Sequence, residues 1–193
     1  MTSSVKGVCR LWTSNSSTES PYSLLFECVT AKEQIATCCT VLSGNCLVIG
    51  DSRGGISIFR WGISDVSVHT GVCTESQPVR LDLPIPSQYI LPIDLYIPHA
   101  HGSDLVSYLL EDYDGNGFYS VGHDGCFCVF SSTGEIVSKL KCLPTKSPDQ
   151  IFVIGTKKER SFYVGGFLGG LYIVYDIRKG YQVMKIEGGG WKR

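Results

Sequence analysis

The sequence predicts an all-β chain made of repeated four-stranded units. A short sequence motif, in which a glycine-containing turn leads into a β-branched and aromatic strand, recurs at 50–59, 122–130 and 166–176, with a partial copy at 7–12. Two of the three intervals between copies are about 45 to 48 residues, close to the period of roughly 40 to 45 residues of propeller blades. The composition agrees, because 22 Gly, 10 Tyr and 8 Phe accompany only 18% charged residues, against about 25% in ordinary soluble domains.

Each unit is predicted to contain strands in the same order. The hydrophobic runs at 34–41 and 46–49 flank Ser43-Gly44, a pair that tolerates the positive φ of a hairpin turn. A third strand at 56–59 follows the turn at 51–55. The remaining predicted strands are 24–29, then 105–110, 118–121, 126–130 and 136–141, and then 150–154, 161–165, 171–175 and 181–186.

These strands divide the chain into about three and a half four-stranded propeller blades. The predicted parts are a blade remnant at 1–29, a blade at 30–83 that runs into a proline-rich insertion at 61–101, a blade at 102–141, a blade at 148–187 and the start of a further blade at 188–193. Closed propellers have about four to eight blades, and closure hides the edges of the first and last sheets. We therefore expect a partial propeller that is a fragment of a longer protein.

The insertion at 61–101 departs from the blade pattern. Most of the prolines lie in it, including Pro84, Pro86, Pro92 and Pro98. Proline interrupts a β-ladder because it has no backbone N–H. We therefore expect the middle of the insertion to be a surface loop or an extended crossover, with short strands near its edges at 81–83 and 89–91.

Cysteine content and charge restrict the class of protein. The nine cysteines include no C-x-x-C pair, and free cysteines usually pack as small hydrophobes. No signal peptide is recognised, so this usage predicts a reducing, cytoplasmic location and no structural zinc site. The net charge of −1 comes from 17 Lys plus Arg against 18 Asp plus Glu. This balance excludes a global basic field, and any contact with RNA must come from a local patch.

Two motifs resemble metal sites without completing one. Residues 112–117 match the opening of an EF-hand calcium loop, but position twelve of that frame is His123 where the geometry needs a bidentate Glu. The Asp-Gly and Asn-Gly pairs in this stretch favour a hairpin turn. His99 and His101 form an H-x-H pair with no third ligand in view, which favours a solvated loop. We predict neither a metal nor a cofactor.

The motifs of common enzymes are also missing. The sequence has no G-x-S-x-G nucleophile turn. Its clustered carboxylates, Glu111, Asp112 and Asp114, are explained as turn residues. A propeller hydrolase stays open as an alternative and would require carboxylates that converge at the central channel. A noncatalytic protein is the favoured interpretation, because the fold hosts many functions and no catalytic site can be recognised in the sequence.

Several turn residues are assigned structural roles. Asp51 and Asp124 stand just before a strand, where a short carboxylate accepts backbone hydrogens and fixes the turn. The glycines expected to make these turns are Gly54, Gly125, Gly169 and Gly170. Trp12 and the pair Tyr175-Asp176 occupy the place of the Trp-Asp dipeptide of WD repeats. The repeats are therefore interpreted as divergent WD repeats.

The order of these motifs resembles one family of WD-repeat proteins, the WD repeat-containing protein six family. The stretch 46–55 (CLVIGDSRGG) resembles that family's LVxGDRRGS strand and turn, and 120–125 (SVGHDG) resembles its TTGRDG. Further along, Gly165-Gly166-Phe167 opens a strand that ends at 175–178 (YDIR), and 188–193 (GGGWKR) resembles the family's GGGHR at a blade start. The resemblance extends from about Leu24 to the end of the chain.

The resemblance implies a noncatalytic scaffold. Members of the family partner a methyltransferase that modifies the ribose 2′-hydroxyl at the wobble position of tRNA, and the propeller helps to position the tRNA. The resemblance places RNA or partner contacts at Arg53, Trp191, Lys192 and Arg193, although Trp191 stands where the family has His. An aromatic residue beside two cations can stack on a base and neutralise phosphate. No membrane insertion is expected. The alternative is a scaffold that binds proteins only, in endosomal recycling or signalling.

Overall fold

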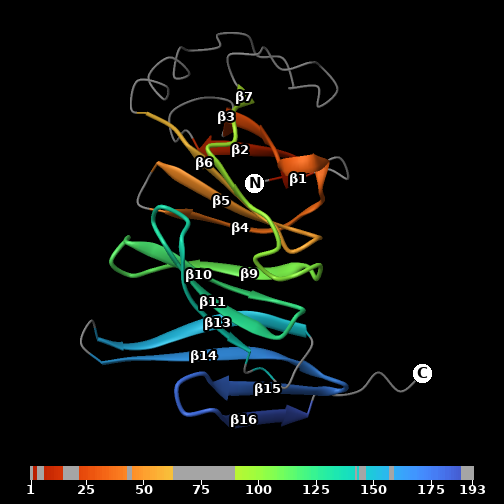
Figure 1. Cartoon of the computed structure of the whole chain (residues 1–193), viewed down its shortest axis with the longest axis vertical. Helices are drawn as coiled ribbons and strands as arrows, with labels where there is room; N and C mark the ends of the chain where they lie inside the picture. Colours follow the sequence, from red (N-terminus) through yellow and green to blue (C-terminus); the bar gives the residue numbers. More distant parts are fainter. Residues whose placement is uncertain are drawn as a thin grey trace.

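The protein consists of four-stranded β-sheets stacked one on another along the long axis of the molecule (Figure 1). The computed structural model describes residues 2–3, 7–14, 22–42, 45–62, 90–141, 143, 147–156 and 159–187. Four sheets are formed within these residues, so the predicted all-β fold class of blade-like units is confirmed. The helix among them is a single 3-10 turn, η1 (Ala31–Glu33), and no helix in the described ranges is long and apolar enough to cross a membrane.

The sheets follow one another in chain order. The first sheet holds β1 (Thr2–Ser3), β2 (Val8–Ser14), β3 (Tyr22–Val29) and β7 (Ile90–Leu91), and the second holds β4 (Ala36–Leu42), β5 (Cys46–Asp51), β6 (Ile56–Arg60) and β8 (Leu95–Ile97). The third holds β9 (Val106–Glu111), β10 (Gly117–Gly122), β11 (Cys126–Ser131) and β12 (Ile136–Lys141). The fourth holds β13 (Ser147–Thr156), β14 (Glu159–Leu168), β15 (Leu171–Asp176) and β16 (Tyr181–Glu187).

The third and fourth sheets are antiparallel meanders that match the predicted blades. Each strand pairs with the next one along the chain, in the order β9-β10-β11-β12 and β13-β14-β15-β16. These strands form because alternating apolar residues are separated by short glycine-containing turns, which is the pattern of a half-buried antiparallel strand. The predicted strands of both units lie within the observed ones or overlap them closely.

The second sheet is completed from beyond the boundary predicted for its blade. Its fourth strand is β8, which pairs antiparallel with β6 and lies after residue 83. Pro92 and Pro98 flank this three-residue strand, and proline is tolerated there because β8 is the edge of the sheet. The predicted strand at 81–83, the middle of the insertion, the Ser43-Gly44 turn and the blade start at 188–193 lie outside the described residues.

The first sheet also takes a strand from the far side of the insertion. Its short edge strand β7 pairs in parallel with β3, through Glu27 with Ile90 and Cys28 with Leu91. The predicted strand at 89–91 is thus found at Ile90–Leu91. The two ends of the insertion therefore belong to two different sheets, since β7 completes the first sheet and β8 completes the second.

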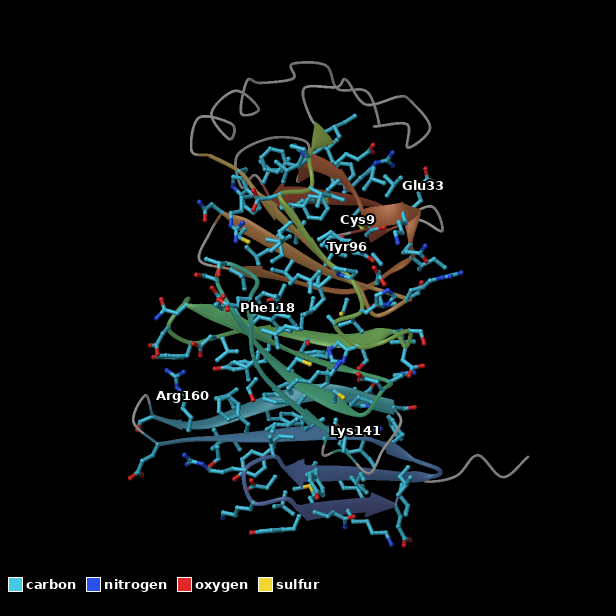
Figure 2. The ribbon with its side chains drawn as sticks, in the orientation of Figure 1. Cys9, Glu33, Tyr96, Phe118, Lys141 and Arg160 are labelled. Carbon is cyan, nitrogen blue, oxygen red and sulfur yellow. The ribbon has the colours of Figure 1, made fainter. Side chains whose placement is uncertain are left out.

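Apolar side chains fill each space between neighbouring sheets (Figure 2). Between the first and second sheets lie Cys9, Phe26, Cys28, Leu47, Ile49, Phe59, Trp61 and Leu91. Between the second and third lie Val48, Ile56, Ile58, Val106, Phe118, Cys128 and Phe130, among others. Between the third and fourth lie Tyr119, Val121, Phe127, Ile151, Val164 and Ile177.

Free cysteines contribute to this packing. Cys9, Cys28, Cys46, Cys126 and Cys128 are all buried and none of them forms a disulfide. Burial, helped by the charges of neighbouring groups, raises the pKa of Cys28 to about 12 and that of Cys9 to about 11. Thiols with such pKa values carry almost no thiolate at neutral pH and are poor nucleophiles.

The turn glycines differ in how tightly they are enclosed, which gives a test of the fold. Gly54 has φ +78° and a Cβ there would lie 2.7 Å from the Asp104 carbonyl oxygen, whereas Gly169 has φ +61° and open space around it. An alanine at Gly169 costs about 1 to 2 kcal/mol for its backbone conformation. Gly54→Ala adds a steric clash, so we expect its urea midpoint to fall clearly further than that of Gly169→Ala. Equal losses in the two variants would contradict the described packing of this turn.

Candidate functional site

The turns that the sequence analysis singled out lie together at one end of the strands, along one side of the stack of sheets. The turns between β5 and β6 and between β10 and β11 meet the connections that lead into β4 and β9 there. The Ser52 N–H donates to the Ile35 carbonyl, the His101 N–H to the Gly54 carbonyl, and the His123 N–H to the Leu105 carbonyl. We call this surface, formed by 31–35, 51–55, 99–104 and 122–126, the turn end. The labelled Glu33 and Lys141 lie on this side of the molecule, and Arg160 lies on the opposite side (Figure 2).

In the second sheet, a buried carboxylate holds the turn. Oδ1 of Asp51 accepts the N–H groups of Arg53 at 2.7 Å and Gly55 at 2.9 Å, and Asp51 is fully buried. The other side of Asp51 faces Tyr96, whose pKa is raised by burial and then by the Asp51 charge. The turn therefore has a fixed backbone, and the side chain that it exposes is that of Arg53.

In the third sheet, a buried histidine links the β10–β11 turn to strand β10. His101, with no exposed surface, places Nδ1 at 2.8 Å from Asp124 Oδ1 and Nε2 at 2.6 Å from Ser120 Oγ. A carboxylate only accepts hydrogen bonds, so Nδ1 carries the proton and, in the neutral ring, Nε2 accepts from the Ser120 hydroxyl. Asp124 also accepts the N–H of Cys126 at 3.0 Å, which closes the β10–β11 turn.

This position of His101 corrects the sequence-based expectation. His101 was predicted to lie on a solvated loop, but it is buried, while His99 beside it is exposed. The signal that could have identified it is the combination of a histidine ahead of a unit, a serine inside the second strand and an aspartate in the following turn. Each of these residues alone is common, and only their meeting in space gives them a joint role.

The chain of hydrogen bonds has the chemical order of a Ser-His-Asp triad but not its accessibility. A catalytic serine must reach a substrate carbonyl and lie beside donors for the developing oxyanion. Ser120 has no exposed surface and sits inside β10, opposite Cys128 in the neighbouring strand. The arrangement therefore stabilises the third sheet and its turn.

Burial sets the charge state of this network. Desolvation lowers the pKa of His101, although Asp124 opposes this effect, so the imidazole is neutral near pH 7. Burial alone would raise the pKa of Asp124, but the hydrogen bonds from His101 and from the Cys126 N–H outweigh it and lower that pKa. Lys139 approaches the other carboxylate oxygen at 3.5 Å and donates to the Ala100 carbonyl at 2.7 Å.

The corresponding turn of the fourth sheet, between β14 and β15, is not held by such a hydrogen-bond network among the described residues. This turn contains Gly169, with φ +61°, and Gly170, and neither has a neighbour that an added Cβ would meet. Phe167 and Leu168 beside them are about half exposed, at 48% and 47%. The glycine turn is thus present where the sequence places it, but it is open and apolar where the other two are closed and polar.

At the opposite end of the strands, the calcium-like motif forms a hairpin turn. The Asp112 N–H donates to the Gly117 carbonyl at 2.9 Å, and Gly115 has φ +68°. The guanidinium of Arg160 in β14 binds Asp112 at 2.7 Å and Asp114 at 2.8 Å. This ion pair links the third sheet to the fourth. Within the described ranges, no group of three or more His, Cys, Asp or Glu residues is arranged to hold a metal ion.

The structure places one of the four predicted contact residues. Arg53 lies exposed on the β5–β6 turn. Trp191, Lys192 and Arg193 lie outside the described residues. No protein-family model matches the sequence, and no curated protein is similar enough to count as a match.

The His101 network makes a pH-dependent prediction. A histidine whose pKa is lowered by folding stabilises the protein above its unfolded pKa of about 6.5, and that stability is lost as the pH falls below it. We expect His101→Ala to cost about 3 kcal/mol at pH 7.5, because Ser120 and Asp124 lose a buried partner. The loss should shrink as the pH falls from 6.5 to 5.

Urea unfolding at several pH values measures this effect. The matched control is His99→Asn, since His99 is exposed and has φ +57°, a conformation that asparagine tolerates. We expect it to stay within about 0.5 kcal/mol of the unsubstituted protein. Equal unfolding midpoints for the unsubstituted protein and His101→Ala would contradict the role given to His101.

Proposed function

We propose that this protein is a noncatalytic WD-repeat scaffold that partners a tRNA 2′-O-ribose methyltransferase and helps to position tRNA for methylation at the wobble position. The observation that carries the proposal is the β5–β6 turn, where the buried Asp51 fixes the backbone and Arg53 stands exposed at the turn end. This turn belongs to the stretch 46–55, which resembles the strand and turn of the tRNA-methylation scaffolds.

A rigid turn end suits the recognition of folded RNA. RNA loops are bound through shape, stacking and contacts to phosphate. A binding residue is most precise when the backbone under it is fixed by packing and hydrogen bonds. Both closed turns at this end meet that condition, through Asp51 in the second sheet and through Asp124 with His101 in the third.

The charge of the chain supports a local contact and not a broad basic surface. The net charge is −1, so attraction to RNA depends on where individual cations stand. Arg53 lies at the turn end, and Lys141 lies on the same side of the molecule (Figure 2). Lys139, by contrast, is engaged with Asp124 and the Ala100 carbonyl. A partner subunit would supply the remaining affinity and the catalytic residues.

The protein-only scaffold is the second candidate. It is favoured by the apolar residues that the fourth sheet exposes, among them Phe167, Met184 and Ile186, each close to half exposed. A large exposed apolar patch on the insertion at 61–101 would favour this candidate over the first. Residues 63–89 of the insertion lie outside the described ranges. This second scaffold would work in endosomal recycling or signalling, through proteins and without RNA.

The proposal predicts how Arg53 affects tRNA binding. In the complex of this chain with its methyltransferase, we expect Arg53→Glu to weaken tRNA binding several-fold and to reduce the slope of log K against log salt by about 1, the effect of losing one phosphate contact. Lys185→Glu makes the same charge change on the far sheet and serves as the control, since Lys185 is exposed on β16. Equal affinities and slopes for the two variants would contradict a role for Arg53.

A further inference from the structure

Two exposed side chains of complementary chemistry stand on neighbouring turns at the turn end. Arg53 is exposed on the β5–β6 turn, and His99 is exposed on the connection between β8 and β9. These two segments are in direct contact, because the His101 N–H donates to the Gly54 carbonyl at 3.0 Å. A cation and an aromatic ring are therefore carried on either side of one backbone hydrogen bond.

The two segments also pack closely around Gly54. A Cβ added to this glycine would lie 2.7 Å from the carbonyl oxygen of Asp104 and 2.9 Å from that of Gly102. The carbonyl oxygen of His101 would lie 2.9 Å away as well. The absence of a side chain at Gly54 thus allows the segment that carries His99 to pack directly on the turn that carries Arg53.

The ring of His99 is held in place at the surface. Its Nδ1 lies 3.0 Å from the Gly102 carbonyl oxygen, and because a carbonyl only accepts hydrogen bonds, Nδ1 carries the proton. The Gly102 N–H donates to the His99 carbonyl at 3.0 Å. The next residue, Ala100, is buried with 1% exposure. A ring that is fixed in this way loses little conformational entropy when a ligand covers it.

The backbone of His99 has a conformation that residues other than glycine seldom adopt. Its φ is +57°, and the other non-glycine residues with positive φ in the described part of the chain are Lys32 and Glu33. All three lie at the turn end, in the connections that lead into β4 and β9. Residues in such conformations cluster at active sites and ligand clamps. The strain therefore points to this end as the surface that holds a ligand.

The charges around the pair restrict the kind of RNA that fits it. The acidic residues Glu33 and Asp104 are exposed at the same end, so the cations there are interrupted by carboxylates. A double-stranded stem is bound through several phosphates of its two backbones. One arginine beside one ring suits a single unpaired nucleotide, whose phosphate the guanidinium neutralises while its base stacks on the imidazole.

We propose that His99 and Arg53 together bind one unpaired nucleotide of the RNA, with the base stacked on the His99 ring and the adjoining phosphate paired with Arg53. The inference rests on the proposed function, because it names the class of nucleotide that the turn end holds. Stacking tolerates any sequence, since every base has a flat face. The pair therefore positions an unpaired nucleotide without selecting its base.

The affinity for tRNA tests the two residues separately. In the complex with the methyltransferase, at pH 8, above the range in which histidines usually titrate, we expect His99→Asn to weaken binding of a tRNA transcript by about five- to a hundredfold, the range for one base stack. The slope of log K against log salt should stay unchanged, because a stacked ring releases no counterions. Arg53→Glu should instead reduce that slope.

Tyr113→Asn is the matched control for the loss of a ring. Tyr113 is 77% exposed on the turn between β9 and β10, at the opposite end of the strands. We expect the tRNA affinity of this variant to stay within about twofold of that of the unsubstituted complex. Asparagine tolerates the positive φ at residue 99, and urea unfolding of His99→Asn establishes that lost affinity reports the missing ring.

Removal of bases from the RNA gives a readout that a purely structural role of His99 would not change. Abasic nucleotides are placed at the unpaired positions of the tRNA, one at a time. At the stacked position, loss of the base should weaken binding to the unsubstituted complex at least about fivefold and change binding to His99→Asn by less than about twofold, because both changes remove the same contact.

The outcomes separate this inference from the proposed function. If Arg53→Glu weakens tRNA binding and His99→Asn does not, the paired site is wrong while the scaffold role stands. The same conclusion follows if no abasic position depends on His99. If the complex binds no tRNA, the paired site and the proposed function both fail.

Discussion

The structure depends on the burial of the apolar faces that neighbouring sheets turn toward each other. A single four-stranded sheet of this kind has no core of its own, and stacking supplies it, as in other repeat proteins. The three apolar layers between the sheets are formed largely by side chains of the strands that the repeated sequence motif predicts. The cysteines take part in this packing, since Cys9, Cys28 and Cys128 are buried within the apolar layers.

Stacking has consequences at both ends of the strands. It brings turns of neighbouring sheets within hydrogen-bonding distance, so that His101 joins Gly54 of one sheet to Ser120 and Asp124 of the next. At the other end, Arg160 of the fourth sheet binds Asp112 and Asp114 of the third. The sheets are thus held by apolar burial in the middle and by polar contacts at the rims.

The sequence predicted what depends on local pattern and missed what depends on distant partners. The hairpin of β10 and β11 could be predicted because alternation and a glycine turn specify it within a few residues. The strand β8 could not, because it is short, lies near prolines and pairs with β6 on the far side of the insertion. A strand was predicted at the position of β7, but its parallel pairing with β3 was not. His101 was missed for the same reason: a buried histidine is recognised by its partners, and Asp124 and Ser120 reach it only through the fold. The exposure of Arg53 could be predicted because it lies within the turn at 51–55, and its role in binding stays a prediction from the family resemblance.

The most direct test of the scaffold account is ultraviolet crosslinking of the chain to RNA in cells, followed by mass spectrometry of the crosslinked peptides and of the proteins that co-purify. The account predicts crosslinks within 31–35, 51–55, 99–104 or 122–126, with tRNA as the bound RNA and a ribose methyltransferase among the partners. Crosslinks confined to the opposite end of the strands, where Arg160 lies, would contradict it. Recovery of trafficking or signalling proteins with neither RNA nor methyltransferase would also contradict it.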